Sequence, residues 1–412
     1  MEEAFFRREA GRIVAVLTRM FGVHNLALAE DVAQETLARA FEAWRLSGVP
    51  EHGEALVMAA AKNRAIDVLR RERTARKFAP ELTRMLESEW TMLPTVDELF
   101  APAALRDDEL RMMFSCCHPK LAHDTQVALV LNVLCGFRAR EIAHAFFLNE
   151  AAVEKRLVRA KAALAESKNL FELTSADFST RLSTVQRALY LLFNEGYHGA
   201  NAEETIRVEL CAEALRLVRL LVAHAPSSTP ETRALAALFC LHAARLPGRA
   251  DDAGNLLPLA EQDRTRWDPS LIAEGLAHLE KSLADDFTVF HLEAGIAALH
   301  AGAPSTKDTR WGDIVKHYDV LMNLEPSPVV ALSRAIAIAE RDGPAEGLAA
   351  IHAIEDADRL ATYPFYRAAI GELELRCGRH DTARTHFEAA RGLARNDGER
   401  RAIDKRIRAC GS

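Results

Sequence analysis

Apolar residues recur along this chain at intervals of three and four, the spacing that gathers them on one face of an α-helix. No run of Val, Ile, Thr and aromatic residues alternates with polar residues in the way that a half-buried β-strand requires. Glycine and proline, the residues that interrupt helices, number only 20 and 15 among 412 residues. The sequence therefore predicts an all-α protein, and its length suggests about two to four domains.

The helical pattern divides the chain into four expected segments. These are a first domain at 1–77, a linker at 78–105, a second domain at 106–170 and a C-terminal helical domain at 174–412. The linker prediction depends on three prolines and on weak periodicity. The first domain should contain three helices, at 3–21, 26–44 and 54–76.

The C-terminal segment contains an internal repeat. The stretch SPVVALSRAIAIAERDGPAEGLAAIHAI, from Ser327, is echoed 36 residues later by YPFYRAAIGELELRCGRHDTARTHFEAA, from Tyr363. Each copy predicts a helix, a polar turn holding Gly343 or Gly378, and a second helix. This period suits tetratricopeptide-like repeats of about 34 residues, which bury their apolar faces only by stacking.

Charge is unevenly distributed along the chain. Residues 1–170 carry 24 basic and 24 acidic residues, so the rest of the chain supplies the whole net charge of −7. Within the neutral part, residues 62–77 hold seven Lys and Arg against two acids, and a second basic cluster lies at 138–161. Two local basic patches on a neutral background indicate contacts with the phosphates of a nucleic acid.

The strongest local pattern lies in GFRAREIAHAFFLNEAAVEKRLVRAKAAL, residues 136–164. It predicts helices at 139–146 and 150–166 joined by a very short turn, with Asn149 as N-cap of the second helix. One face of that helix is apolar: Val153, Leu157, Ala160 and Leu164. The opposite face carries Ala152, Lys155, Arg156 and Arg159. This arrangement is typical of a helix-turn-helix whose second helix enters the major groove, although the segment alone could also be a solvated amphipathic hairpin.

Two further helices carry patterned polar faces. AAAKNRAIDVLRRERTARK, residues 59–77, turns Ala61, Ala65, Val68 and Leu69 inward and presents a basic stripe outward. Such a stripe can follow a phosphate backbone, although a charge-rich helix is more often only a solvated face. AEDVAQETLARAFEAW, residues 29–44, has an acidic outer face, and its helix is expected to pack through Leu28, Val32, Leu37, Ala40 and Phe41.

The order and spacing of these three helices resemble extracytoplasmic-function RNA polymerase sigma factors over about residues 1–170. Further phrases resemble the subgroup with a long tetratricopeptide-type C-terminal extension: DELRMMFSCCHP from Asp108, LYLLFNEGY from Leu189, EQDRTRWD from Glu261 and SPVVALSRAIA from Ser327. The resemblance implies a factor that binds core RNA polymerase and promoter DNA. It also implies a C-terminal extension that regulates the factor in cis.

The resemblance implies roles for particular residues. Core polymerase would be bound by Glu30, Asp31, Gln34, Glu35, Phe41 and Trp44. The minus-ten element would be contacted by Lys62, Asn63, Arg64, Asp67, Arg70, Arg71 and Arg73. The minus-thirty-five element would be read by Arg140, Ala152, Lys155, Arg156 and Arg159. Two positions depart from the family pattern: the segment EALVMAAAKN around Lys62 lacks the Trp often seen there in the family, and Phe147 stands where many helix-turn-helix turns have glycine.

Several residues that suggest other chemistry are interpreted as structural. Adjacent cysteines on a helix point about 100° apart and lack a CxxC partner, so Cys116 and Cys117 are expected to be buried packing residues rather than zinc ligands. The C-terminal histidines His198, His242, His278, His291 and His300 lack ligand spacing and are expected to be core or surface residues. The run Glu261–Asp268 could line a ligand groove, with Trp267 as platform and Arg264 or Arg266 as anion contact, but a helix corner locked by ion pairs is favoured.

The sequence therefore predicts a cytoplasmic sigma factor with no enzymatic activity, no metal and no cofactor. Its expected partners are core RNA polymerase, promoter DNA and a protein or small-molecule ligand of the C-terminal domain, with no membrane. Neither a signal peptide nor a membrane span is expected, and the seven cysteines are expected to be reduced. The alternative is a DNA-binding regulator with a repeat sensor domain that does not join polymerase. A helical enzyme would need a catalytic constellation in 174–412, which the sequence does not offer.

Overall fold

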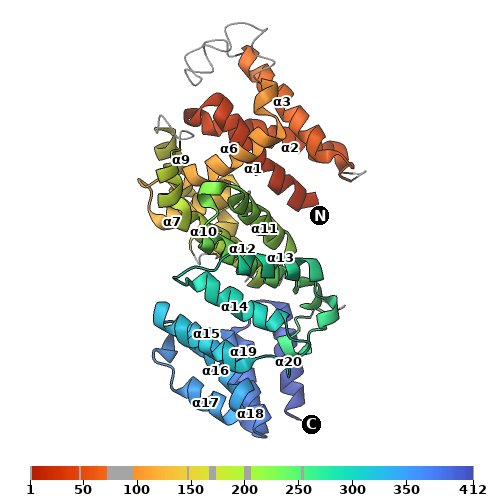
Figure 1. The fold of residues 1–412 in the computed structure, drawn as a ribbon. Helices are drawn as coiled ribbons and strands as arrows, with labels where there is room; N and C mark the ends of the chain where they lie inside the picture. The colour runs from red at the N-terminus through yellow and green to blue at the C-terminus, as the bar shows by residue number, and fades with distance from the viewer. Residues whose placement is uncertain are drawn as a thin grey trace. The chain divides into compact units, whose positions relative to one another are not determined.

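The computed structural model describes residues 2–45, 48–71, 96–145, 148–166, 173–198, 206–251 and 255–411. In these ranges the chain is helical, and the one pairing of extended residues is an isolated bridge between Ala250 and Leu256 (Figure 1). The all-α prediction is confirmed. Contacts divide the chain into two units: Met1–Phe193 with Arg219–Ser227, and Asn194–Val218 with Ser228–Ser412.

The described part of the first unit contains the following named helices. They are α1 (Glu2–Phe21), α2 (Leu26–Trp44), α3 (Gly53–Arg71), α6 (Pro102–Cys116), α7 (His123–Val133), α8 (Ala139–Ala145) and α9 (Glu150–Ala165), with short 3-10 turns η1 (Val23–Asn25) and η2 (Ala225–Ser227). Helices α10 (Ser175–His198) and α11 (Val208–Ala223) contribute residues to both units. Within the first unit, Phe178 of α10 packs edge-on against Phe114 of α6, with 4.7 Å between ring centroids.

Helix α1 is central to the first unit, because it packs against α2, α3 and α6. Its apolar residues from Ile13 to Leu17 are buried, as expected of a helix with neighbours on several sides. Gly11 lets α1 approach the end of α7: a Cβ there would lie 2.1 Å from the carbonyl oxygen of Leu134. Only glycine permits so close an approach between backbones.

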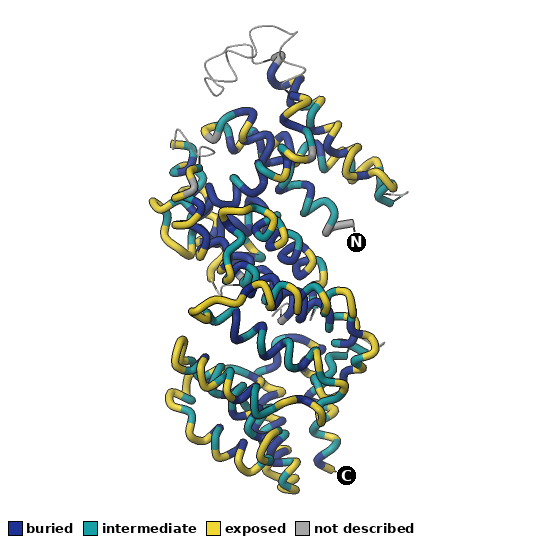
Figure 2. The backbone as a smooth tube through the Cα atoms, in the orientation of Figure 1, coloured by how far each residue is buried: buried dark blue, intermediate teal, exposed yellow. Residues whose placement is uncertain are grey.

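The second unit contains the C-terminal helices. They are α12 (Pro230–Ala243), α13 (Pro269–Glu280), α14 (Val289–Ala301), α15 (Trp311–Leu324), α16 (Pro328–Asp342), α17 (Pro344–His352), α18 (Pro364–Arg376), α19 (His380–Leu393) and α20 (Asp397–Ala409), with 3-10 turns η3 (Leu246–Gly248), η4 (Leu259–Glu261), η5 (Arg264–Arg266) and η6 (Ala357–Leu360). Helix α12 is buried along most of its length and packs against α13 and α14 (Figure 2).

The repeat predicted from Ser327 and Tyr363 folds as two helix pairs. The turns lie at the expected glycines, which adopt positive φ angles of 122° at Gly343 and 77° at Gly378. Gly347 brings α17 against α16, since a Cβ there would lie 2.3 Å from the Cβ of Ala339. The two pairs share one core cluster that includes Leu332, Ile351 and Leu373, so each pair buries its apolar face against its neighbour.

The face of α2 differs from the sequence prediction. Its buried residues are Leu26, Ala29, Val32, Ala33 and Thr36, whereas Phe41, expected inside, is 46% exposed. Of the other predicted positions, Val32 is buried and Leu28, Leu37 and Ala40 are half-buried, so the prediction was wrong at Phe41. Ala29, Ala33 and Thr36, which were not expected inside, complete the buried face.

The inward face of α3 was predicted correctly, since Ala61, Ala65, Val68 and Leu69 are all buried. Cys116 and Cys117 are also buried, as expected of packing residues. Burial raises the pKa of the Cys116 thiol to about 12, so it is protonated and unreactive at neutral pH. In the part of the chain that the structure describes, no cluster of three or more His, Cys, Asp or Glu could hold a metal, and no helix is long and apolar enough to cross a membrane.

Candidate nucleic-acid and polymerase interfaces

Helices α8 and α9 form the helix-turn-helix that the sequence predicts. The side chain of Asn149 caps α9 by accepting a hydrogen bond from the backbone N–H of Ala152 at 3.3 Å. The four predicted apolar residues of α9 are its buried ones. On the other side Ala152, Lys155 and Arg159 are exposed and Arg156 is half-buried. A rigid helix therefore presents cations outward, as recognition in the major groove requires.

A hollow of about 570 Å³ runs beside this cationic face. It is lined by Lys155, Arg156 and Arg159 of α9 and, where α7 begins, by Lys120, Leu121, Ala122 and Thr125. Lys120 is exposed at its edge and was not singled out from the sequence. No local pattern marks it, because the turn before α7 approaches α9 only in the folded unit. The exposed Arg140 lies on α8.

The basic helix α3 presents fewer unpaired cations than its sequence suggests. Lys62 is paired with Asp97, which precedes α6. Arg64 is paired with Glu35 of α2 at 2.8 Å. Asn63 and Asp67 are exposed. The side chains of Arg70 and Arg71, together with Arg73, lie outside the described residues, as does the turn residue Phe147.

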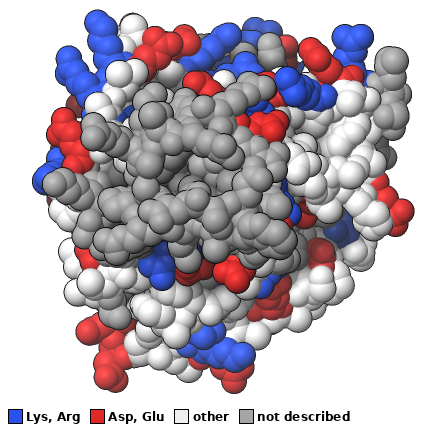
Figure 3. All heavy atoms as spheres, turned by 90° about the horizontal axis from the view of Figure 1, so that it is seen from above, with Lys and Arg blue, Asp and Glu red and all other residues white. Residues whose placement is uncertain are grey.

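A larger hollow of about 740 Å³ adjoins Lys62. It lies among α1, the loop and first turns at 49–59, and residues Asp97, Phe100 and Leu105. The resemblance to sigma factors implies that residues 46–62 hold single-stranded bases, and this hollow lies beside the described part of that segment. Seen from above in Figure 3, Lys and Arg side chains interleave with Asp and Glu around the undescribed residues.

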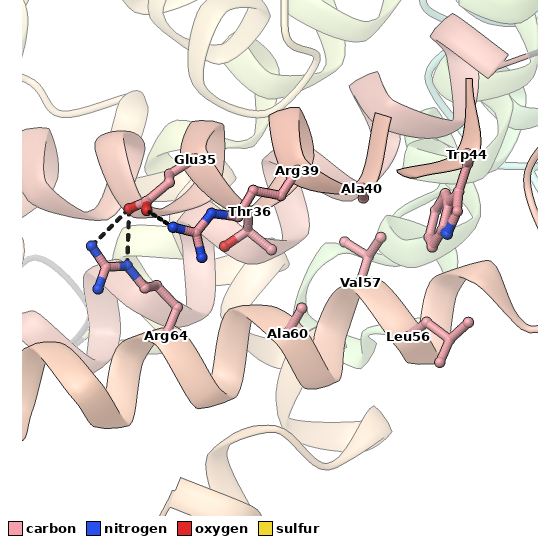
Figure 4. A pocket seen from close by; sticks show the side chains of 9 residues that line it. All are labelled: Glu35, Thr36, Arg39, Ala40, Trp44, Leu56, Val57, Ala60 and Arg64. Carbon is pink, nitrogen blue, oxygen red and sulfur yellow. Dashed lines mark hydrogen bonds and ion pairs between the residues drawn. The ribbon is translucent and has the colours of Figure 1, made fainter. Parts of the chain in front are cut away.

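The face of α2 expected to bind polymerase combines acids with a small apolar hollow. Figure 4 shows Arg39 and Arg64 both reaching the carboxylate of Glu35, with Trp44 and Leu56 farther along the same hollow of about 250 Å³. Asp31 and Gln34 are exposed. Glu35 and Trp44, both expected to bind polymerase, thus line the same hollow.

The two aromatic residues of this face also stabilise the first unit. The ring of Trp44 stacks on Phe6 of α1, with 6.0 Å between centroids, and Phe41 meets Phe6 edge-on at 5.6 Å. Aromatic pairs at these distances stabilise a fold beyond their buried area. Trp44 and Phe41 therefore hold α1 to α2, whether or not they contact polymerase.

Helices α1 and α2 also contact the helix-turn-helix region directly. Glu30 accepts a hydrogen bond from Lys161 of α9 at 2.5 Å. Arg7 pairs with Glu141 at 3.0 Å and lies over the ring of Phe137. Of the residues singled out from the sequence, Glu30 and Lys62 are therefore engaged by partners that sequence reasoning did not identify.

A third contact between these regions involves a buried carboxylate. Asp108 of α6 pairs with Arg19 of α1 at 2.6 Å, and its side chain is fully buried although Arg19 is 40% exposed. Its second oxygen, Oδ2, has no hydrogen-bond partner in the described structure. Burial raises the pKa of Asp108 to about 6 and outweighs the attraction of Arg19, which lowers it.

We expect Asp108 to make stability depend on pH. Because its pKa is raised on folding, the folded state binds a proton between about pH 4 and 6 that the unfolded state does not bind. Its contribution to stability therefore increases as the pH falls through 6. Thermal denaturation measures the free energy of unfolding of the wild type minus that of Asp108→Asn. This difference should be about 1 kcal/mol larger at pH 5 than at pH 7.5. A constant difference between the two proteins would contradict the raised pKa.

Comparisons with known proteins place these surfaces in a family. Residues 5–75 match the model of Sigma-70 region 2, and residues 111–164 match that of Sigma-70, region 4. Residues 181–283 match a family of unknown function, DUF6596. An uncharacterized protein of Rhizobium meliloti (strain 1021) is 38% identical over 390 residues, which cover 94% of this chain and 90% of that protein. The chain belongs to the RNA polymerase sigma factors of the extracytoplasmic-function type and carries an additional C-terminal helical domain.

Proposed function

We propose how this sigma factor divides its work among the described surfaces. Helix α9 reads the minus-thirty-five element through Lys155, Arg156 and Arg159, with Arg140 of α8 and Lys120 on neighbouring phosphates. Helix α3 contacts the minus-ten element, and the hollow beside Lys62 receives single-stranded bases. The acidic and aromatic face of α2 binds core polymerase. The observation that carries the proposal is the exposed cationic face of α9, opposite a wholly buried apolar face.

The partners and location follow from the family. Regions 2 and 4 of sigma factors imply binding of core RNA polymerase and promoter DNA, and sigma factor families are not enzymes. Because a sigma factor acts where its polymerase acts, we propose a cytoplasmic location. We also retain the proposed segments: region 2 at 1–77, a linker at 78–105, region 4 at 106–170 and a regulatory domain at 174–412.

We propose that binding to polymerase releases contacts within the first unit. Glu30 would leave Lys161 to reach polymerase, and Lys62 would leave Asp97 to reach DNA. Both pairs join the region 2 helices to segments that follow them in the chain. Breaking these ion pairs therefore reduces the free energy gained on binding polymerase. A variant in which such a pair is already weakened should favour the polymerase-bound state.

Removing the partner of Glu30 is expected to tighten binding to core polymerase. Lys161→Gln should raise the affinity of the full chain for core enzyme, without DNA, by about twofold to fivefold, the range of a partly exposed ion pair. The matched control is Lys155→Gln, which removes the same charge from the exposed face of α9. An equal effect of both variants, or weaker binding by Lys161→Gln, would argue against release of this contact. A fluorescence titration with labelled core enzyme measures the difference.

We further propose that the C-terminal domain regulates the factor in cis. The support is its acidic character beside two basic segments in the same chain. A truncation after residue 173 would be a poor test, because it would remove Phe178 and Arg181, which contact Phe114 within the first unit. Truncation after Ser227 retains every residue of that unit. In run-off transcription, a folded 1–227 protein as active as the full chain would contradict regulation in cis.

A further inference from the structure

The second unit contains two half-buried arginines, Arg245 and Arg264, beside one buried indole ring. Trp267, which follows η5, is only 4% exposed. The guanidinium carbon of Arg264 lies 4.9 Å from the centroid of its ring, and that of Arg245, just after α12, lies 5.4 Å away. Cations are attracted to the face of an indole, but this interaction is weaker than an ion pair with a carboxylate.

Neither arginine of this cluster has an acidic partner. In the ranges that the structure describes, no carboxylate lies within ion-pair distance of Arg245 or Arg264. Asp308, whose charge favours the cationic form of Arg264, is hydrogen-bonded to Ser305 at 2.6 Å. Burial lowers the pKa of both guanidinium groups, yet arginine keeps its proton at any physiological pH.

The hydrogen bonds of the cluster leave several polar atoms unmatched. Arg264 donates through Nη1 to the backbone carbonyls of His300 and Ala303, at 2.5 and 2.6 Å. Arg245 makes a long contact of 3.5 Å with Gln262. Four buried nitrogens have no partner among the described residues: Nε of Arg245, Nη2 of Arg264, Nε1 of Trp267 and Nδ1 of His300.

The histidine of this cluster, His300, carries no charge at neutral pH. Burial and the two nearby arginines lower the pKa of His300 to about 4, so it is neutral at pH 7. A neutral imidazole can donate one more hydrogen bond without adding positive charge. The described surroundings therefore contain two permanent cations and further N–H donors, and the acid whose charge acts on Arg264, Asp308, is not within ion-pair distance.

We propose that the cluster of Arg245, Arg264 and Trp267 binds a small oxyanion, the carboxylate or phosphate group of a ligand. A buried cation without a counter-charge is strongly destabilising, and the guanidinium fork matches the planar geometry of such oxygens. The oxyanion would accept hydrogen bonds from Nε of Arg245, Nη2 of Arg264 and Nε1 of Trp267. The test of this site does not depend on the proposed regulation in cis, because it measures anion binding and not transcription.

The experiment is thermal denaturation of the full chain with sodium phosphate or sodium citrate, against sodium chloride at equal ionic strength. Phosphate or citrate is expected to raise the melting temperature by roughly 2–5 °C over chloride, and the more effective anion identifies the chemistry of the ligand group. Arg245→Met should abolish this rise. Its own melting temperature without added anion should be unchanged or higher, since an uncompensated charge has been removed.

The control is Arg310→Met, which removes an arginine whose side chain is 73% exposed and should keep the full response. If Arg245→Met does not fold, Arg245→Lys keeps the charge without the fork and should weaken the response severalfold. Equal melting in all three salts, or equal responses of wild type and Arg245 variants, would overturn the proposal.

Discussion

Arg156→Ala combined with Arg159→Ala should reduce promoter-specific run-off transcription by core polymerase at least tenfold. Both side chains lie on the face of α9 opposite its buried residues. Each good contact of an arginine with a base edge contributes about 1–3 kcal/mol of discrimination, so losing two changes binding by one order of magnitude or more. Because Val153, Leu157, Ala160 and Leu164 remain, the variant should fold and still bind core enzyme.

The charge-matched control for this pair lies in the C-terminal domain. Arg310→Ala with Lys316→Ala removes two exposed cations of α15 and its start, and should leave transcription unchanged. Output should be measured on a promoter selected by the wild type, at fixed salt, because phosphate contacts make affinity strongly salt-dependent. If the α9 variant transcribes from this promoter as well as the wild type, α9 is not the helix that reads the minus-thirty-five element.

The helix-turn-helix could be predicted because its determinants are local. Asn149 caps α9 through its own backbone neighbours, and the spacing of four apolar residues defines one face whatever lies behind it. The same holds for α3, whose small inward residues pack as expected. Helix periodicity and capping are properties of a few consecutive residues, so one sequence suffices to recognise them.

The pairing of the site residues could not be predicted, because it depends on contacts between distant segments. Glu30 meets Lys161 across 131 residues of sequence, and Lys62 meets Asp97, which lies within the segment 78–105 that was expected to be only a linker. The buried face of α2 was predicted only in part, since it includes Ala29 and Ala33, whereas Phe41 is exposed. Large side chains indicate a buried face only where the neighbouring helix leaves room for them.

The run Glu261–Asp268 was interpreted either as a ligand groove or as a helix corner locked by ion pairs, and the structure has features of both. Glu261 pairs with Lys405 and Arg406, and Asp268 caps α13, as a corner locked by polar contacts requires. Arg264, however, has no acidic partner among the described residues and joins Arg245 at Trp267. The sequence supplied the right residue types for an anion contact, but Arg245 lies upstream, and only the fold brings it to the ring.

Gly11→Ala is expected to destabilise the protein by about 1–3 kcal/mol, the usual cost of inserting an atom into a packed interior. The new Cβ would lie 2.1 Å from the carbonyl oxygen of Leu134 and 3.0 Å from its Cα, so one backbone segment must move away from another. Alanine is intrinsically the better helix former by roughly 0.5–1 kcal/mol, so any loss of stability measures the close approach of α1 to the end of α7.

The matched control is Gly392→Ala in α19, where a Cβ would meet nothing within 4 Å and only the gain in helix propensity remains. Thermal or urea denaturation should therefore shift in opposite directions for the two variants. If Gly11→Ala proves as stable as the wild type, α1 does not pack here as described.

A destabilised but folded Gly11→Ala protein should also bind core polymerase more tightly, because loosening α1 weakens the neighbouring contacts of Arg7 and Arg19 that hold region 2 against region 4.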